Sequence, residues 1–598
     1  MQSFKKIIFL FNPNERKRAL LLMVMMLIMA LLDMIGVASI MPFVAVLTNP
    51  DVVETNFILN TMFQASSIFG VDNKQQFLFA LGIIVFILLV TSLAFKALTT
   101  WVQLRFVQMR EHSIGRRLVE GYLHQPYSWF LNRHSADLGK TILSQVQQVN
   151  GNAIGPMFNL ISQSIVAIAL ISLLFVVDPE LSLIISFTLC LTYALVFKLI
   201  KNILSRIGKE RLMSDRLRFE SLTEAFGAAK EVKVGGLEKV YIKRFSNPSE
   251  IFAYNTSTAQ IISQLPRYAL EIVAFGGILL VILYFMSKNN NLGTALPMIS
   301  LYAFAGYRLM PALQKIYISL TQIRFVGPAL DNLYKDLKNL KPFNSNQVED
   351  IITFNNMISL KGISFHYPDV SRIALKNIQI NIPVGSAVGF VGVTGSGKTT
   401  MVDIILGLLE AQQGTLEVDG KVITENNVRA WQRCIGYVPQ HIFLADDTVA
   451  ANIAFGIETK DINQKDVERA AKLANLHEFV IEELSNKYQT VVGERGIRLS
   501  GGQRQRIGIA RALYLKPQLL IFDEATSALD SQTEMTVMKS LKDLRKNITT
   551  ILIAHRLSTV KDCDNIFVLE KGKLISEGKY NNLIEKSPVF RKLAQVKL

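Results

Sequence analysis

The sequence predicts a helical membrane domain fused to a soluble α/β domain. Half of the 598 residues are hydrophobic and only 19% are charged. The mean hydropathy is +0.29, whereas a soluble chain of this length would not average above zero. The long apolar stretches lie before about residue 325, and after about residue 350 short apolar runs alternate with helical patterns. Together these three observations indicate the fold class.

The composition excludes two other classes of protein. Ample apolar content and a modest charge fraction exclude disorder. A disulfide scaffold is excluded because the three cysteines, Cys190, Cys434 and Cys563, stand in unrelated contexts. The net charge of +16 would suggest nucleic acid in a soluble protein. Cytoplasmic loops of membrane proteins collect Lys and Arg, so no nucleic-acid partner is expected.

Six stretches are long and apolar enough to cross a bilayer, which takes about 20 residues per helix. They cover residues 19–47, 76–102, 153–177, 181–201, 268–287 and 295–320. The connections between spans two and three and between four and five are long, and the latter is rich in Lys and Arg, whereas the other connections after span two are short and nearly free of both. The positive-inside rule therefore places the long loops and both termini in the cytoplasm. The helix formers in these loops predict that spans two to five continue as helices beyond the membrane.

Two further segments lie outside the predicted spans, one between spans one and two and one after span six. Residues 52–70 carry Ile58, Leu59, Met62 and Phe63 at helical spacing, which predicts either an amphipathic helix on the outer membrane surface or a packed external loop. The polar segment after the last span reads as a linker. The predicted domains are therefore a transmembrane domain at 1–325, a linker at 326–349 and a soluble domain at 350–598.

Residues 392–400, with the sequence GVTGSGKTT, match a Walker A loop between a predicted strand and a predicted helix. The glycines let backbone N–H groups close around phosphate oxygens, and the start of the helix adds its positive dipole. Lys398 supplies charge to the phosphates, and the Thr399 hydroxyl ligates Mg²⁺. ATP and Mg²⁺ are the expected cofactors. The candidate binding residues of this loop are Gly392, Thr394, Gly395, Ser396, Gly397, Lys398, Thr399 and Thr400.

A second motif follows the apolar run 519–522 and is a candidate Walker B. Asp523 would hold Mg²⁺ through water, and Glu524 would polarise the water that attacks the phosphate. About twenty residues earlier stands the stretch LSGGQ at 499–503. Its spacing before a Walker B identifies the soluble part as resembling the nucleotide-binding domain of an ABC transporter, over about residues 350–598.

The resemblance implies roles for further residues. Tyr367 would stack on adenine, Gln440 would ligate Mg²⁺ and couple the site to the membrane domain, and His555 would hold the γ-phosphate. Two nucleotide domains of a homodimer would enclose two ATP molecules. Each ATP would contact the Walker A loop of one subunit and Ser500, Gly501, Gly502 and Gln503 of the other. Glu494 and residues 527–530 complete the pattern.

Six spans joined to one such domain resemble half of a type IV ABC exporter, an ATP hydrolase coupled to transport. Segments near 126–133 and 226–239 would form the coupling helices.

Ionisable residues within spans are candidate substrate ligands. Arg308 lies about 13 residues into span six, roughly 20 Å deep at 1.5 Å per residue. Lys315 lies seven residues further on nearly the same face, and Arg267 stands at the start of span five. These cations would form a site for an anionic lipid headgroup. The alternative is that they snorkel to the cytosolic surface.

The sequences around Arg267 and around Arg308 and Lys315 resemble the lipid-linked oligosaccharide flippases of bacterial protein N-glycosylation. That resemblance implies a polyprenyl-diphosphate-linked oligosaccharide, moved from the inner to the outer leaflet of the bacterial inner membrane. Lys315 departs from the family's arginine and lacks its bidentate fork. The alternatives are an exporter of another amphipath, such as lipid A, a phospholipid or a drug, and an ATP-gated channel.

Overall fold

The computed structural model describes residues 2–66, 73–288, 292–340, 352–367, 373–524, 548–554 and 557–595, together with single positions within 68–71 and 532–539. The chain forms two compact units. Unit 1 comprises Met1–Gln125 and Asn132–Phe343, and unit 2 comprises Pro126–Leu131 and Asn344–Leu598. Apart from the short stretch 126–131, which belongs with unit 2, the predicted transmembrane domain 1–325 lies in unit 1, and the predicted soluble domain 350–598 lies in unit 2.

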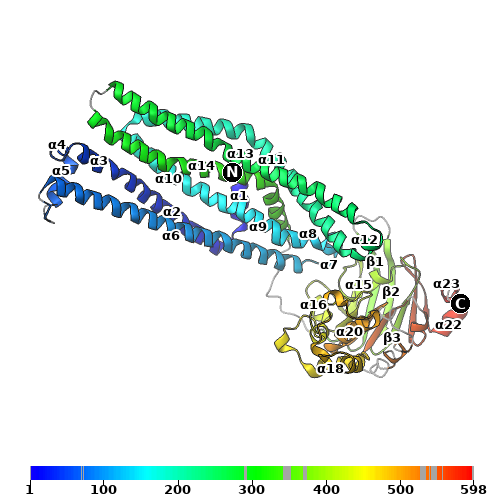
Figure 1. Ribbon diagram of the computed structural model, residues 1–598. Helices are drawn as coiled ribbons and strands as arrows, with labels where there is room; N and C mark the ends of the chain where they lie inside the picture. The colour runs from blue at the N-terminus through cyan, green and yellow to red at the C-terminus, as the bar shows by residue number, and fades with distance from the viewer. Residues whose placement is uncertain are drawn as a thin grey trace. The chain divides into compact units, whose positions relative to one another are not determined.

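Unit 1 is a bundle of long helices that lie alongside one another (Figure 1). Its members are α1 (Gln2–Leu10), α2 (Pro13–Ala38), α3 (Ile40–Thr48), α6 (Lys74–Leu123), α10 (Gly155–Val177), α11 (Pro179–Gly227), α13 (Glu238–Lys288) and α14 (Leu292–Asn339). Five of the six predicted spans fall within these helices, the first being shared by α2 and α3, and the span 153–177 begins two residues before α10. Among the described residues, three helical stretches are apolar enough to cross a membrane: Pro13–Thr48, Lys74–Leu123 and Ala136–Val177.

Several helices continue far beyond the length that a bilayer needs. Helix α6 has 50 residues, which at 1.5 Å per residue is roughly 75 Å, against about 30 Å of hydrocarbon. Before α10 the chain is already helical through α8 (Ser135–Lys140), the π-helical turns η2 (Thr141–Gln145) and η3 (Asn150–Ile154), and α9 (Val146–Val149) between them. The predicted extension of spans two to five as helices is confirmed.

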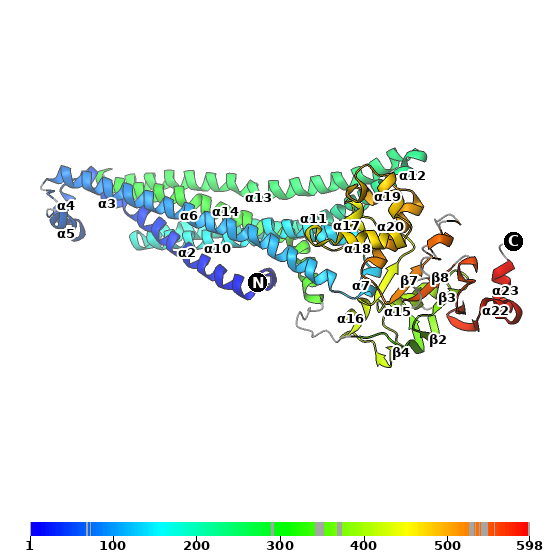
Figure 2. The same ribbon diagram turned by 90° about the horizontal axis from the view of Figure 1, so that it is seen from below.

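The segment after span one forms two short helices, α4 (Val52–Thr55) and α5 (Phe57–Ser66). Figures 1 and 2 show both at one end of the bundle, opposite to α12 (Ala229–Val234). Leu59 and Phe63 pack against a small core with Val46 of α3 and Phe77 of α6. Phe57 is 86% exposed. The segment is therefore helical, packs by one side and exposes apolar groups on another, and its place on the outer membrane surface stays a prediction.

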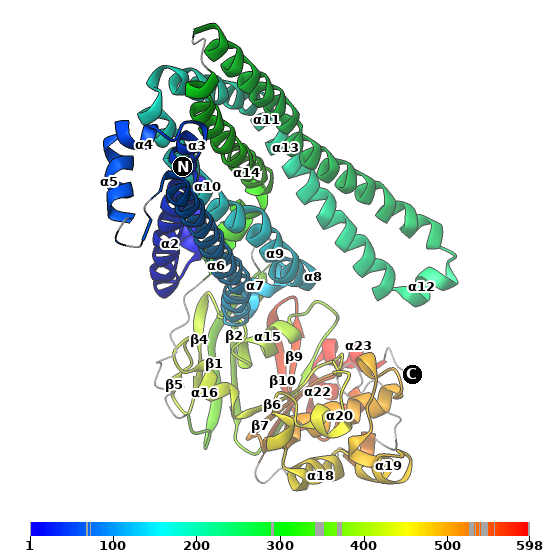
Figure 3. The same ribbon diagram turned by 60° about the vertical axis from the view of Figure 1, so that its left-hand side comes forward.

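The predicted linker at 326–349 is wrong for its first part. Helix α14 continues to Asn339, and its residues Leu330 and Leu333 are fully buried. The Lys and Asp residues that suggested a linker occupy the other faces of this helix. Residues 341–350 lie outside the described part of the chain. Figure 3 shows α11 and α13 running side by side towards α12, which lies within the predicted coupling segment 226–239.

Unit 2 contains two sheets. The first is antiparallel, in the order β2-β1-β4-β5, and the second has the order β10-β9-β3-β8-β7-β6. In the second sheet β9, β3, β8, β7 and β6 are parallel, and β10 is antiparallel to β9. The strands are β1 (Met357–His366), β2 (Ile373–Pro383), β3 (Ala387–Val391), β4 (Gln413–Val418), β5 (Lys421–Val422), β6 (Ile435–Val438), β7 (Leu519–Asp523), β8 (Thr549–Ile553), β9 (Asn565–Glu570) and β10 (Lys573–Gly578).

Helices accompany these sheets, and most of them add residues to two hydrophobic cores. The helices are α7 (Tyr127–Leu131), α15 (Lys398–Ile405), α16 (Val428–Gln432), α17 (Val449–Ile453), α18 (Gln464–Leu473), α19 (His477–Glu482), α20 (Gly501–Tyr514), α22 (Tyr580–Lys586) and α23 (Pro588–Gln595). Every residue of β3, β7 and β8 is buried, as expected for parallel strands covered on both faces. The ends of β3 and β7 then carry the loop and the carboxylates of the candidate site.

Candidate functional site

The Walker A loop joins the buried strand β3 to α15, and its glycines are required by geometry. Gly397 has φ +106°, and a Cβ there would lie 2.8 Å from the carbonyl oxygen of Ala374. Gly395 also has positive φ, at +76°. The loop therefore wraps closely enough for backbone N–H groups to line a phosphate-sized cradle, which is the arrangement that its sequence predicts.

Two side chains of the loop point to an anionic ligand. The Lys398 ammonium donates to the carbonyl oxygen of Gly392 at 2.8 Å. Burial lowers the pKa of Lys398, while the carboxylates of Glu524 and Asp523 raise it. Ser396 Oγ is buried and has no hydrogen-bond partner among the described residues. A buried hydroxyl without a partner is costly, and phosphate oxygens would satisfy both groups. The loop thus fits the phosphates of ATP.

The other predicted loop residues lie where a nucleotide could reach them. Thr394 and Thr399 are exposed, and Thr400 is buried. The hydroxyls of Tyr367 and Thr400 lie 3.1 Å apart, which brings the predicted adenine-stacking ring to the loop. Among the described residues, no cluster of three His, Cys, Asp or Glu could hold a metal. A Mg²⁺ ion here would therefore depend on Thr399, Gln440, Asp523 and the phosphates together.

The carboxylates of the predicted Walker B stand at the end of β7. Asp523 is 7% exposed and accepts a hydrogen bond from Tyr437 at 3.3 Å. Glu524 takes φ +52°, a left-handed conformation that is uncommon outside glycine and concentrates at functional sites. Gln440 Nε2 donates to Glu524 Oε2 at 2.7 Å. The structure thus joins Gln440 and Glu524, while His555 and residues 527–530 lie outside the described residues.

A further carboxylate, which the sequence analysis missed, lies beside these groups. Burial, with a contribution from the Asp523 carboxylate, raises the pKa of Asp403 on α15 to about 6. The tyrosines 437 and 127 face it, and burial together with Asp403 raises the pKa of the Tyr127 hydroxyl. Tyr127 belongs to α7, which lies within the predicted coupling segment 126–133 and groups with unit 2.

The signature stretch begins helix α20. Ser500 is the N-cap, with its hydroxyl accepting from the Gln503 N–H at 3.2 Å, and the Gln503 side chain accepts from the Ser500 N–H at 2.8 Å. This capping box fixes the first turn of the helix. Gly501 and Gly502 add no bulk there, so the turn presents an open, positive helix end, as an anion site requires.

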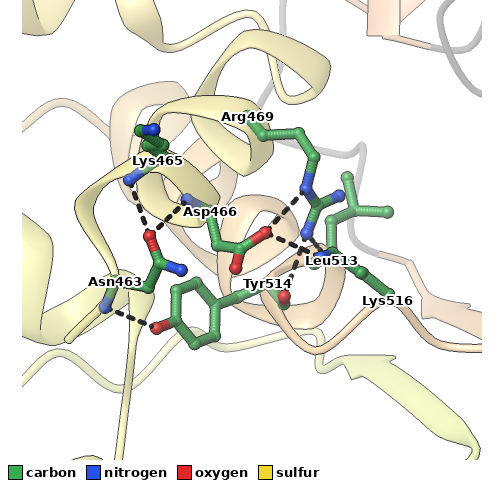
Figure 4. Close-up of polar contacts among 7 residues, drawn as sticks. All are labelled: Asn463, Lys465, Asp466, Arg469, Leu513, Tyr514 and Lys516. Carbon is green, nitrogen blue, oxygen red and sulfur yellow. Dashed lines mark hydrogen bonds and ion pairs between the residues drawn. The ribbon is translucent and has the colours of Figure 1, made fainter. Parts of the chain in front are cut away.

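The opposite end of α20 is held by α18, as Figure 4 shows. Arg469 donates to the carbonyl oxygens of Leu513 and Tyr514, at 3.1 and 3.0 Å. Asp466 pairs with both Arg469 and Lys516. These bonds satisfy carbonyls that a helix end otherwise leaves unpaired. The signature residues are therefore carried by a helix that is fixed at both ends.

In unit 1, Arg308 belongs to a cluster of charges between three helices. Its Nη1 lies 3.0 Å from Oδ1 of Asp33 on α2, and Lys96 Nζ of α6 lies 3.4 Å from the other oxygen. Asp33 and Lys96 both lie within predicted spans, and charged residues in spans are the signal that could have revealed them. The sequence analysis flagged Arg308 and missed its carboxylate.

The other two predicted substrate ligands lie apart from this pair. Arg267 pairs with Glu271 at 2.8 Å and lines a cavity of about 240 Å³ with Tyr317 and Gln314. Pro266 has no N–H for the carbonyl of Ile262, and the Tyr317 hydroxyl donates to that oxygen at 3.4 Å instead. Lys315 is exposed. Arg308 and Arg267 each have a carboxylate partner of their own, and among the described residues no contact joins either of them to Lys315.

A larger polar cavity of about 940 Å³ lies elsewhere in unit 1, between α1, α8, α11 and α14. Seven Lys or Arg residues line it against three Asp residues. Among the described residues, its members Lys209, Arg324 and Lys335 form no ion pair. The cavity is therefore electropositive, a property suited to anionic ligands.

Comparison with known proteins decides the family. The ABC transporter family matches residues 375–527, and the ABC transporter transmembrane region matches residues 52–307. The chain is 30% identical over 489 residues to an ATP-dependent lipid A-core flippase of Syntrophus aciditrophicus, covering 81% of this chain and 80% of the relative. The chain belongs to the ABC transporter family. This transporter therefore joins a helical transmembrane region to a domain whose ATP hydrolysis drives transport.

Two further likenesses extend over nearly the whole transporter. An ATP-dependent lipid A-core flippase of Albidiferax ferrireducens is 29% identical over 583 residues, which is 95% of each chain. A solved structure described as a bacterial Atm1-family ABC exporter with ATP bound has a TM-score of 0.79 at 22% identity, over 98% of this chain and 99% of that one. The latter shows that the fold is that of an ABC exporter.

Proposed function

We propose that this transporter is an ATP-driven flippase for a phosphate-bearing amphipathic lipid of the lipid A class. It acts as a homodimer in the bacterial inner membrane, with the nucleotide domain and both termini in the cytoplasm. The similarity to lipid A-core flippases over 80–95% of their length supports an amphipathic lipid as cargo. The observation that supports a phosphate group on the cargo is Arg308, a cation that lies deep in a predicted span and is only 16% exposed.

The nucleotide site supplies the energy. Lys398 and Ser396 bind the phosphates, and the backbone of the glycine loop encloses them. Thr399, Asp523 and Gln440 would hold Mg²⁺, which neutralises charge on the phosphates when bound. Glu524 orients the attacking water. It accepts a hydrogen bond from Gln440, and both side chains would be needed by Mg²⁺ and water once ATP is bound. Ser500, Gly501, Gly502 and Gln503 of one subunit close the site of the other.

The electropositive cavity supports the direction of transport. It lies at the helix extensions that the positive-inside rule places on the cytoplasmic side, where an anionic headgroup of the inner leaflet would enter. Arg308 lies further along α14 towards the outer side. A phosphorylated headgroup would meet the cavity first and Arg308 second.

A polyprenyl-diphosphate-linked oligosaccharide is the second candidate cargo. Its diphosphate would use the same cations. The exposed Phe57 and Ile58 on α5 favour it, because they offer an apolar surface to a long polyprenyl chain outside the bundle.

Purified transporter in proteoliposomes would be given fluorescent lipid A or labelled polyprenyl-diphosphate oligosaccharide. Appearance of each lipid on the far leaflet would be measured with ATP, with Glu524→Gln as the inactive control. We expect ATP-dependent movement of lipid A that the control lacks. Movement of the oligosaccharide lipid alone would select the second candidate. If neither moves while ATP is hydrolysed, the proposed cargo class is wrong.

A further inference from the structure

Asp33 is a buried carboxylate that receives three donors from two neighbouring helices. Ser92 Oγ of α6 donates to its Oδ1 at 2.9 Å, Arg308 of α14 reaches the same oxygen at 3.0 Å, and Lys96 of α6 reaches Oδ2 at 3.4 Å. Gly36, one turn along α2, faces Leu89 of α6, where an added Cβ would lie at an ordinary contact distance of 3.4 Å. The carboxylate is therefore held in place by three donors that come from two helices.

The exposure of the charges is graded. The Asp33 side chain is 1% exposed, that of Arg308 16% and that of Lys96 33%. The carboxylate lies innermost, and both cations are more accessible than it is. An anion that approached this site would therefore meet the two cations before Asp33.

Other buried ion pairs of unit 1 differ in this respect. In Lys140–Asp215 the side chains are 2% and 6% exposed, and in Arg110–Glu15 they are 6% and 11% exposed. Both partners of those pairs are closed off, as in ion pairs that join helices. The Asp33 cluster alone among these three combines a closed carboxylate with accessible cations.

The charges of the cluster do not balance. Lys96 and Arg308 contribute +2 and Asp33 contributes −1, which leaves +1. The Lys96 contact of 3.4 Å is longer than the 2.7–2.9 Å of a good charge-assisted bond. Arg308 has five N–H donors, and only Nη1 contacts Asp33. Both cations thus retain donors for further oxygen atoms.

We propose that Asp33 fills the anion site of the transporter and that the cargo phosphate must displace it from Lys96 and Arg308. This inference rests on the proposed function, because it assumes a phosphate-bearing cargo. A phosphate carries about −1.5 to −2 charges and three acceptor oxygens, whereas the carboxylate carries −1 and two. The phosphate therefore competes well for the two cations, and singly charged membrane lipids compete poorly. Asp33 thus sets the threshold that keeps resident lipids out of the site.

The size of the effect follows from occupancy. If the state with Asp33 on the cations predominates about ten to one, the apparent affinity for phosphate is lowered by about tenfold. Replacing Asp33 by Asn removes the competing charge and keeps a group of the same shape beside Ser92. Asp33→Asn is expected to lower the half-maximal concentration of a phosphorylated lipid by about tenfold. The value for the same lipid without phosphate, which does not use the cations, is expected to stay unchanged.

The test measures lipid-stimulated ATP hydrolysis in nanodiscs of phosphatidylcholine. The probes are bisphosphorylated lipid A, the same lipid after phosphatase treatment, and phosphatidylglycerol. Asp51→Asn serves as the matched control, since Asp51 pairs with Lys74 at 2.7 Å on the exposed segment before α4. In Asp33→Asn, lipid A is expected to act at about tenfold lower concentration, and phosphatidylglycerol is expected to begin to stimulate. Asp51→Asn is expected to behave as the wild type.

Each other outcome overturns either the proposed cargo chemistry or the proposed role of Asp33. If the wild type responds equally to lipid A with and without phosphate, the proposed cargo chemistry fails. If the wild type prefers the phosphorylated lipid and Asp33→Asn shifts both lipids alike, Asp33 is only a packing element. Should Asp33→Asn not fold, Asp33→Asn/Arg308→Gln keeps the net charge at +1. That double variant is expected to lose the preference for phosphate, and an unchanged preference would contradict the inference.

Discussion

The nucleotide site of unit 2 and the charge cluster of unit 1 both offer cations to phosphate, yet they are built differently. The nucleotide site uses contiguous residues, the loop 392–400, the turn 500–503 and the pair Asp523–Glu524, and much of its binding surface is backbone. The membrane cluster uses three side chains from three helices, and Asp33 lies 275 residues from Arg308. A backbone site can be recognised in the sequence, whereas a side-chain site exists only after the helices pack.

The two sites also treat their own charges differently. In the nucleotide site Lys398 donates only to backbone carbonyls, and Ser396 has no partner among the described residues, so a ligand has little to displace. In the membrane cluster Arg308 already holds a carboxylate. The first site is ready for its ligand, and the second must exchange one anion for another. This difference suits tight binding of ATP at the nucleotide site and weaker binding at the membrane cluster of a cargo that must later be released.

The largest expected effect tests the chemistry of the nucleotide site. Glu524→Gln keeps the shape and the contact with Gln440 but removes the group that polarises water, so turnover is expected to fall about 10²- to 10⁴-fold. ATP binding is expected to persist. Phosphate release and equilibrium ATP binding would be measured side by side, with the exposed Glu410→Gln as control. Undiminished turnover in Glu524→Gln would remove Glu524 from the mechanism.

The next prediction tests whether the nucleotide site depends on its backbone. Gly397→Ala would place a Cβ 2.8 Å from the Ala374 carbonyl at φ +106°, and strain of about 1–3 kcal/mol is expected to weaken ATP binding by about 5- to 150-fold. Gly420→Ala is the matched control, because its φ is +80° with no atom within 4 Å of the added Cβ. Calorimetric titration with ATP would give both affinities. Equal affinity for ATP in the two variants would contradict the claim that the backbone of the loop at Gly397 forms the phosphate site.

The membrane cluster is tested by removing its arginine. Arg308→Gln is expected to raise the concentration of phosphorylated lipid needed for half-maximal stimulation by about 10- to 150-fold, since a bond to a charged group contributes about 1.5–3 kcal/mol. Hydrolysis without lipid is expected to persist. Arg105→Gln removes an exposed arginine that stacks on Trp101 and is expected to leave lipid stimulation unchanged. A loss of hydrolysis without lipid in Arg308→Gln would show a structural role for Arg308 instead.

The smallest expected effect concerns Asp403, whose pKa is raised from 3.8 to about 6 by burial and by Asp523. The folded state binds the proton of this carboxyl more tightly than the unfolded state does. The free energy of unfolding therefore falls as the pH rises from 3.8 to about 6 and the carboxyl ionises. Asp403→Asn is therefore expected to raise the thermal midpoint of unit 2 more at pH 8 than at pH 5. With allowance for partial solvent exposure, the difference is about 1 kcal/mol, or roughly 2–4 °C. Differential scanning of the full chain in detergent would measure it, and an equal gain at both pH values would contradict this account.

Much of the nucleotide site could be predicted from the sequence. Residues 392–400 and 500–503 each fold locally, so their strand, loop and helix contexts are visible in the sequence itself. The contact between Gln440 and Glu524 needed the sheet, because β6 and β7 are neighbours only after folding. Asp403 was missed because one carboxylate on a helix gives no signal until Asp523 and Tyr437 surround it.

In the membrane domain, the sequence predicted elements better than contacts. The six spans were visible because apolar length alone marks them. The end of α14 was misjudged because Leu330 and Leu333 are few among polar residues, although their spacing places them on one helix face. Arg308 stood out as a charge in a span, but its partner Asp33 lies in the first span, and nothing in the sequence links the two.

The most direct test of the central claim is lipid movement by the full transporter in proteoliposomes. Arrival of fluorescent lipid A on the far leaflet would be followed for the wild type, Glu524→Gln and Arg308→Gln under the same ATP concentration. The account predicts movement by the wild type, none by Glu524→Gln, and slowed movement by Arg308→Gln that higher lipid concentration restores. Equal rates of movement in the wild type and Arg308→Gln at low lipid concentration would contradict it, because the phosphate would then be carried without the membrane cluster.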